Sequence, residues 1–118
     1  MDDYRCTLRK FAVRDDRFIE ALLQTNPENA ARSGIDAYSH ALVRIGALNA
    51  MNAPPPAYMN AIDAAREAGA SDEQIVGTLI AVLPLVGVAR VVSAAPNLGL
   101  ALGYDVGEAL ETVNPSVS

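Results

Sequence analysis

The sequence is poor in the residues that carry most side-chain chemistry. Its 118 residues include one cysteine, one histidine and one lysine, and tryptophan is absent. The single cysteine, Cys6, excludes an intrachain disulfide and any metal site built from several thiolates. Cys6 also has no second thiol with which to complete a redox cycle. We therefore expect neither a bound metal nor a cofactor.

Charged residues are scarce as well, and the basic ones are outnumbered. They make up 19% of the chain, and the formal net charge is −5. Proteins that bind nucleic acid neutralise its phosphates with a basic surface, and anionic membrane surfaces attract the same kind of surface. We therefore expect no nucleic-acid partner and no membrane partner.

Long apolar runs are also missing. The longest charge-free segments of the hydrophobic half are Ile75–Ala89 and Val91–Tyr104, and each is interrupted by a proline. Neither reaches the roughly 18–20 residues that a membrane-spanning helix needs. The first residues contain no apolar stretch of the kind found in secretion signals, so we expect a cytoplasmic protein.

Alanine is abundant, with 21 residues, whereas aromatic residues form only 5% of the chain. Alanine is the strongest helix former, and the apolar residues recur at helical spacing without the alternation of a strand. These patterns predict an all-α fold. Residues 1–34 are expected to form an N-terminal arm and a first helix, and residues 1–14 within them are either an arm or a short helix of their own. Residues 35–113 are expected to form a helical core and residues 114–118 a loose tail, within one domain overall.

Capping and helix-breaking residues predict where the helices begin and end. Asp15 is suited to cap a helix over Arg17–Thr25, and Asn26-Pro27 is expected to end it, which leaves Glu28–Gly34 as a connector or at most one turn of helix. Ser71 and Gln74 have the spacing of a capping box. The further helices expected are Ala37–Asn52, Tyr58–Ala68, Asp72–Val86, a stretch from Gly87 to about Leu102, and Val106–Thr112.

The helix predicted at Asp72–Val86 is apolar on nearly every side. A helix of this kind is typical of a protein core or of a contact between subunits. Together with the apolar stretch that follows it to Leu102, it offers more apolar surface than one small domain easily covers. We therefore expect a homo-oligomer.

Three segments carry a resemblance to a known family. They read IDAYSHALV at 35–43, AAREAGASDEQI at 64–75 and LPLVGVAR at 83–90. In residue type and spacing they resemble the carboxymuconolactone decarboxylase family, which includes the alkyl hydroperoxidase D-like proteins. The resemblance spans roughly residues 35–103. It implies a compact bundle of about six helices of the alkyl hydroperoxidase D-like type, assembled as a trimer or hexamer.

The resemblance also implies where the reactive residues of that family would lie. Its peroxidase branch uses a Glu-x-x-Cys-x-x-Cys-x-x-x-His motif, in which one thiolate attacks peroxide and the second cysteine resolves the product. Aligned on Gly69, the Glu, two Cys and His positions fall on Met51, Pro54, Ala57 and Ala61. The histidines of the decarboxylase branch fall on Ala61 and Ala81. The chain therefore lacks the residues for both activities.

A few side chains remain as candidates for binding or catalysis. Arg90 and Arg44 are isolated charges in apolar segments, so each is a candidate to bind an anion. His40, one helical turn before Arg44, is a candidate general base. Tyr58 and Asn60 follow the prolines, where they are candidates to donate a hydrogen bond to a ligand and to orient it. The structural alternatives are that the arginines pair with a neighbour or reach solvent, and that Tyr58 fills the place of the motif.

Two main functional hypotheses follow, beside a third, thiol peroxidase activity through Cys6. The first is a non-catalytic homo-oligomer that binds a small anionic or apolar ligand or serves as an assembly partner. The second is an enzyme with altered acid–base chemistry on a small carboxylate or lactone. In that case Arg44 or Arg90 would hold the anion, and His40 or Tyr58 would move the proton. Convergence of Arg44, Arg90 and Tyr58 on one cavity would favour the enzyme.

Overall fold

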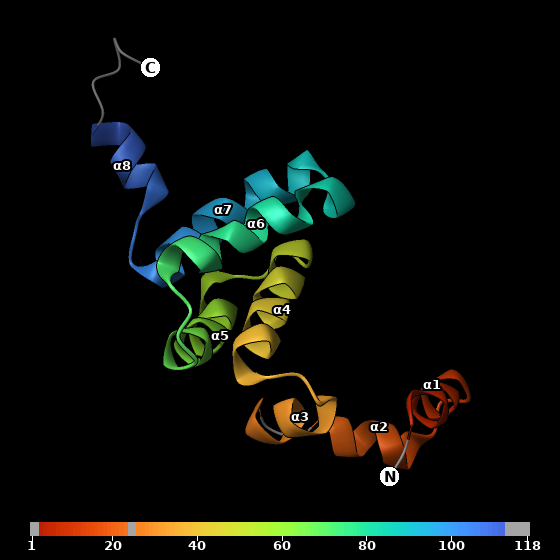
Figure 1. Ribbon diagram of the computed structural model, residues 1–118. Coiled ribbons are helices and arrows are strands. Elements are labelled where there is room, and N and C mark those ends of the chain that lie inside the picture. Colours follow the sequence, from red (N-terminus) through yellow and green to blue (C-terminus); the bar gives the residue numbers. More distant parts are fainter. Residues whose placement is uncertain (1–2, 24–25, 113–118) are drawn as a thin grey trace. The chain divides into compact units, whose positions relative to one another are not determined.

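The computed structural model describes residues 3–23 and 26–112, and this part of the chain is all-helical, as predicted, without a strand. The predicted tail at 114–118 lies outside it. The contacts divide the chain into two units, Met1–Asp36 with helices α1–α3 and Ala37–Ser118 with α4–α8 (Figure 1). The helices are α1 (Tyr4–Ala12), α2 (Asp16–Leu22), α3 (Asn26–Ser33), α4 (Ala37–Ala50), α5 (Pro55–Glu67), α6 (Asp72–Val86), α7 (Val88–Leu102) and α8 (Val106–Thr112).

The first unit contains more helix than the sequence predicts. The Asp3 carboxylate accepts a hydrogen bond from the backbone N–H of Cys6 at 3.1 Å, which starts α1 where an arm or a short helix is expected. Asp15 caps α2 as predicted, because its carboxylate accepts from the N–H of Phe18 at 3.2 Å. The connector predicted at Glu28–Gly34 is wrong. Pro27 lies in the first turn of α3, where proline's missing N–H is not needed by the helix.

The second unit is built around a core where α4, α5, α6 and α7 contact one another. Half of its buried members are alanines, whose small side chains let neighbouring helices approach closely. Proline also moves a boundary here, because α5 begins at Pro55, three residues before the predicted start at Tyr58. The buried core residues are Ala41, Ile45, Ala53, Tyr58, Ala61, Ile62, Ala65, Ala70, Ile75 and Leu98.

Helices α6 and α7 form an antiparallel pair joined at Gly87, whose φ of 93° favours glycine. Although α6 is apolar on nearly every side, the core of one chain buries only its residues Ile75 and Thr78. Four aliphatic side chains of this helix pair are largely exposed, and we use the name outer face for these four residues together: Ile80 is 72%, Leu85 86%, Val88 68% and Val92 65% exposed. Within the described residues, no helix combines the length and the hydropathy of a membrane span.

Candidate functional site

A chain of buried hydrogen bonds joins α5, α4 and α6 at the centre of the second unit. The hydroxyl of Tyr58 donates to Oδ1 of Asn49 at 2.8 Å, and Nδ2 of Asn49 donates to Oγ1 of Thr78 at 2.9 Å. The Thr78 hydroxyl in turn donates to the carbonyl of Ile75 at 2.6 Å. Tyr58 and Asn49 are fully buried, and Thr78 is 8% exposed. We call these three side chains the polar relay.

The polar relay accounts for Tyr58, which the sequence offers as a hydrogen-bond donor to a ligand. Burial raises the pKa of the Tyr58 phenol above its usual 10.0, so the group stays protonated near neutral pH and acts as a donor. Its hydroxyl donates to Asn49, and both the oxygen and the nitrogen of the Asn49 amide form hydrogen bonds within the relay. Buried polar groups that are all paired in this way lock helices together. This arrangement supports the structural alternative for Tyr58.

Arg90 lies at the C-terminal end of α4. Its Nη1 donates a hydrogen bond to the carbonyl of Ala50, the last residue of α4, at 3.1 Å. The last carbonyls of a helix lack partners within the helix and carry a partial negative charge, which a guanidinium neutralises. The isolated charge of α7 is therefore used to cap another helix.

Two further α7 side chains hold the turn that follows α4. The hydroxyl of Ser93 donates to Oδ1 of Asn52 at 2.8 Å, and Nδ2 of Asn97 donates to the carbonyl of Ala53 at 3.2 Å. Asn52 has a positive φ of 55°, a conformation that asparagine tolerates better than most residues. The turn between α4 and α5 is thus fixed from α7. This turn carries the first two positions of the family motif by resemblance.

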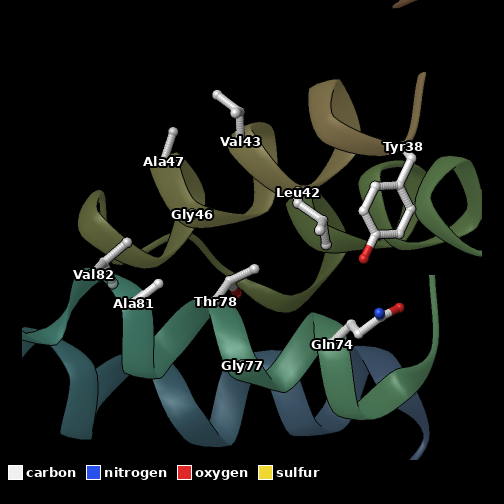
Figure 2. A pocket seen from close by; sticks show the side chains of 10 residues that line it. All are labelled: Tyr38, Leu42, Val43, Gly46, Ala47, Gln74, Gly77, Thr78, Ala81 and Val82. Atoms are coloured by element: carbon white, nitrogen blue, oxygen red, sulfur yellow. The ribbon is translucent and has the colours of Figure 1, made fainter. Parts of the chain in front are cut away.

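A groove of about 660 Å³ lies between α4 and α6 (Figure 2). Most of its lining is apolar, and its polar side chains are a tyrosine, a glutamine and a threonine. The threonine is Thr78, whose hydroxyl belongs to the polar relay. The lining residues are Tyr38, Leu42, Val43, Gly46, Ala47, Gln74, Gly77, Thr78, Ala81 and Val82.

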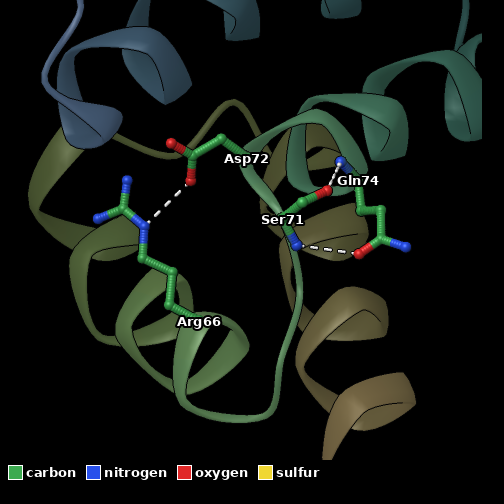
Figure 3. A network of polar contacts seen from close by, with 4 residues as sticks. All are labelled: Arg66, Ser71, Asp72 and Gln74. Atoms are coloured by element: carbon green, nitrogen blue, oxygen red, sulfur yellow. Dashed lines mark hydrogen bonds and ion pairs between the residues drawn. The ribbon is translucent and has the colours of Figure 1, made fainter.

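Gln74 is held at the groove by the capping box that the sequence predicts. The backbone N–H of Gln74 donates to Oγ of Ser71 at 3.1 Å, and the backbone N–H of Ser71 donates to Oε1 of Gln74 at 2.9 Å (Figure 3). Nearby, Nε of Arg66 lies 3.1 Å from Oδ1 of Asp72. These contacts fix the start of α6 and the glutamine side chain with it.

The candidate residues that the sequence suggests do not line this groove. Arg44 and Asn60 are exposed on α4 and α5, and His40 is buried on α4. None of the five candidates, and none of the four motif positions, lines the groove. Of those motif positions only Ala61 is buried, while the rest, Met51, Pro54 and Ala57, are exposed. Arg44, Arg90 and Tyr58 therefore do not meet in the groove, the convergence that would favour an enzyme.

Sequence reasoning missed the side chains that the structure does bring together. Asn49 and Thr78 of the polar relay, and Tyr38 and Gln74 of the groove, were not predicted to bind or to pair across helices. One signal was present for the relay, because Asn49 follows Leu42, Ile45 and Leu48 on the inward face of its helix. A polar residue on an inward face requires a partner.

No protein-family model, curated protein or solved structure matches the chain. The family resemblance, the oligomeric state and the ligand therefore stay predictions. Within the part of the chain that the structure describes, no three His, Cys, Asp or Glu side chains come together as ligands for a metal ion.

Proposed function

We propose that the protein is a non-catalytic homo-oligomer of the alkyl hydroperoxidase D-like type, a self-associating member of the carboxymuconolactone decarboxylase family without its reactive residues. The observation that carries this proposal is the outer face of α6 and α7. Its four aliphatic side chains are between 65% and 86% exposed in the single chain. Completely burying one such side chain contributes about 1.5–3 kcal/mol, so covering several of them offsets part of the entropy that association costs.

The charge distribution supports a second copy as the cover. Arg90 is the single charged residue from Gln74 to Tyr104, although the whole chain has a net charge of −5. Two copies repel each other through their acidic residues, and this repulsion is weakest where both present an uncharged surface. In a two-fold contact one patch meets its own copy, and in the contact of a trimer two different patches meet; an apolar face without charges is compatible with both. The resemblance implies that the assembly is a trimer or hexamer.

The positions of the candidate residues support the non-catalytic part of the proposal. Tyr58 directs its proton to Asn49, and Arg90 caps α4 through the carbonyl of Ala50. Catalysis by acid and base requires both groups within hydrogen-bond reach of one substrate. The groove contains neither Arg44 nor His40, so it offers no such pair from these candidates.

The test is the molar mass of the complete chain in solution, measured by sedimentation equilibrium at tens of micromolar. We expect the wild type to sediment as an oligomer and the Ile80→Glu/Val92→Glu double variant as a monomer with unchanged helical circular dichroism. The matched control is Val13→Glu, which places a charge at a 74% exposed valine of the first unit and should leave the oligomer intact. A monomeric wild type, or a double variant of unchanged mass, would overturn the proposal.

A further inference from the structure

The groove between α4 and α6 has the size and the walls of a small-molecule site. Its volume of about 660 Å³ falls within the roughly 300–1,000 Å³ of ligand pockets. Leu42 and Val43 contribute apolar walls on α4, and Ala81 and Val82 do so on α6. A Cβ atom added at Gly77 would meet no atom within 4 Å, which shows that the space beside α6 is open there.

Two hydrogen-bonding groups lie at one end of this apolar space. Figure 2 shows the hydroxyl of Tyr38 and the amide of Gln74 at the same end of the groove. The capping box occupies Oε1 of Gln74 with the N–H of Ser71, so the amide offers a ligand its NH₂ group. Within the described residues, neither this nitrogen nor the Tyr38 hydroxyl makes a hydrogen bond to the protein. A ligand group beside the Gln74 nitrogen must therefore accept a hydrogen bond, and the same group can accept a second one from the Tyr38 hydroxyl.

The electrostatics of the groove favour a neutral acceptor over a carboxylate. No arginine, lysine or histidine lines the groove. At the helix start beside Gln74, Asp72 is paired with Arg66, and the carboxylate of Glu73 opposes a further negative charge. An anion that leaves water for such a site loses its hydration without gaining a cationic partner. A ketone or ester carbonyl loses far less, and it accepts hydrogen bonds equally well from an amide and a hydroxyl.

We propose that this groove binds a small, neutral, largely apolar molecule whose terminal carbonyl accepts hydrogen bonds from Gln74 and Tyr38. The site goes beyond self-association, because none of the four outer-face residues lines the groove. The sequence leaves open whether the ligand is anionic or apolar. The proposed site favours the apolar ligand, since no cationic side chain lines the groove. Arg44, Asn60 and Arg90 take no part in it.

The test uses the complete chain and a neutral fluorescent ketone, 6-propionyl-2-dimethylaminonaphthalene, as the probe. We expect saturable binding with a blue shift of its emission, because the naphthalene leaves water for the apolar walls of the groove. Decan-2-one should displace the probe, and decanoate at pH 7 should need at least a tenfold higher concentration. Absence of saturable binding, or displacement by decanoate as effective as by the ketone, would overturn the proposal.

Two variants locate the probe within the groove. Gly77→Leu fills the open space with an apolar side chain and replaces a helical glycine by a better helix former, so binding should fall at least tenfold while the fold is kept. Gln74→Glu keeps an acceptor for the N–H of Ser71 but removes the NH₂ donor, and should also weaken binding at least tenfold. Ala57→Leu, at an exposed alanine outside the groove, is the matched control and should bind as the wild type does.

Further measurements distinguish a failure of the ligand-site proposal from a failure of the proposed self-association. The Ile80→Glu/Val92→Glu double variant should still bind the probe, whatever its mass, because its changes lie outside the groove. Equal probe binding by the wild type, Gly77→Leu and Gln74→Glu would place the probe elsewhere and overturn the proposal. If Gly77→Leu abolished assembly and the wild type bound no probe, a second copy would be the occupant of the groove, and the proposal would be wrong.

Discussion

The interactions that stabilise the first unit of the chain differ from those that stabilise the second. In the first, Met1–Asp36, 13 of 36 residues are charged, and neither α1 nor α2 has a buried residue. In the second, Ala37–Ser118, 10 of 82 are charged, and every residue found to be buried belongs to it. The short helices of the first unit therefore depend on caps and on contacts between neighbouring helices, whereas the burial of a core stabilises the second unit.

The local contacts of the first unit illustrate the difference. The aspartates Asp3 and Asp15 cap their helices, and the rings of Phe11 and Phe18 meet edge to face with centroids 5.0 Å apart. The second unit has the polar relay in addition to its apolar core, and it links residues up to 29 positions apart. We therefore expect substitutions of the same kind to cost much more stability in the second unit.

The largest difference should come from removing aliphatic volume. Ile62→Ala, at a core position that is 1% exposed, should lower the free energy of unfolding by about 2–5 kcal/mol, because it leaves a cavity. Leu8→Ala, at a position of the first unit that is 61% exposed, should change it by about 0.5 kcal/mol or less. Urea unfolding followed by circular dichroism measures both. Equal losses would contradict the comparison.

A second difference should come from removing one hydroxyl. Tyr58→Phe leaves Oδ1 of Asn49 buried without its donor, which should cost about 1–3 kcal/mol of unfolding free energy. Tyr4→Phe removes a hydroxyl from a 67% exposed ring of the first unit, and unfolding in urea should be unchanged. If Tyr58→Phe were as stable as the wild type, the polar relay would not stabilise the second unit.

A smaller difference should separate two arginines. Arg90→Met removes the hydrogen bond to the carbonyl of Ala50 and should cost about 0.5–1.5 kcal/mol of unfolding free energy. Arg5→Met removes an exposed ion pair of 3.7 Å with Asp3, and such pairs contribute about 0–1 kcal/mol. Chemical denaturation of the two variants gives the comparison. A larger loss for Arg5→Met would show that capping of α4 from α7 is unimportant.

The relay also predicts a dependence on alkaline pH. Burial raises the pKa of Tyr58 in the folded state above the 10.0 of an exposed phenol, so above pH 10 the unfolded state loses this proton first. The contribution of Tyr58 to stability is therefore complete below pH 10 and is lost as the pH rises through the folded-state pKa. Urea midpoints between pH 8 and 11 should fall more steeply for the wild type than for Tyr58→Phe. Parallel curves would exclude this linkage.

The sequence predicts those parts of the fold that depend on neighbours along the chain. The bounds of α6 and α8, the capping box of Ser71 and Gln74, and the cap at Asp15 follow from local residue types, and the structure confirms them. Helix α3 was missed because proline both ends helices and begins them. The residues before Pro27 do not show whether this proline ends the preceding helix or begins the next one.

The partners of polar side chains were beyond prediction because they are distant in sequence. Arg90 is 40 residues from the carbonyl of Ala50, and Thr78 is 29 residues from Asn49. The sequence shows that the charge of Arg90 needs a partner, but the packing of α7 across the end of α4 decides which one. The groove depends on two helices in the same way, since Tyr38 and Gln74 meet at one end only after folding.

The most direct test of self-association through the outer face is the reactivity of single thiols. In a Cys6→Ser background, Ile80→Cys and Leu8→Cys place one thiol at positions that are 72% and 61% exposed in the single chain. At tens of micromolar protein, a neutral maleimide should modify the Ile80→Cys variant at least tenfold more slowly, and adding Val92→Glu should remove the difference. Equal rates for the two thiols would contradict burial of this face between copies.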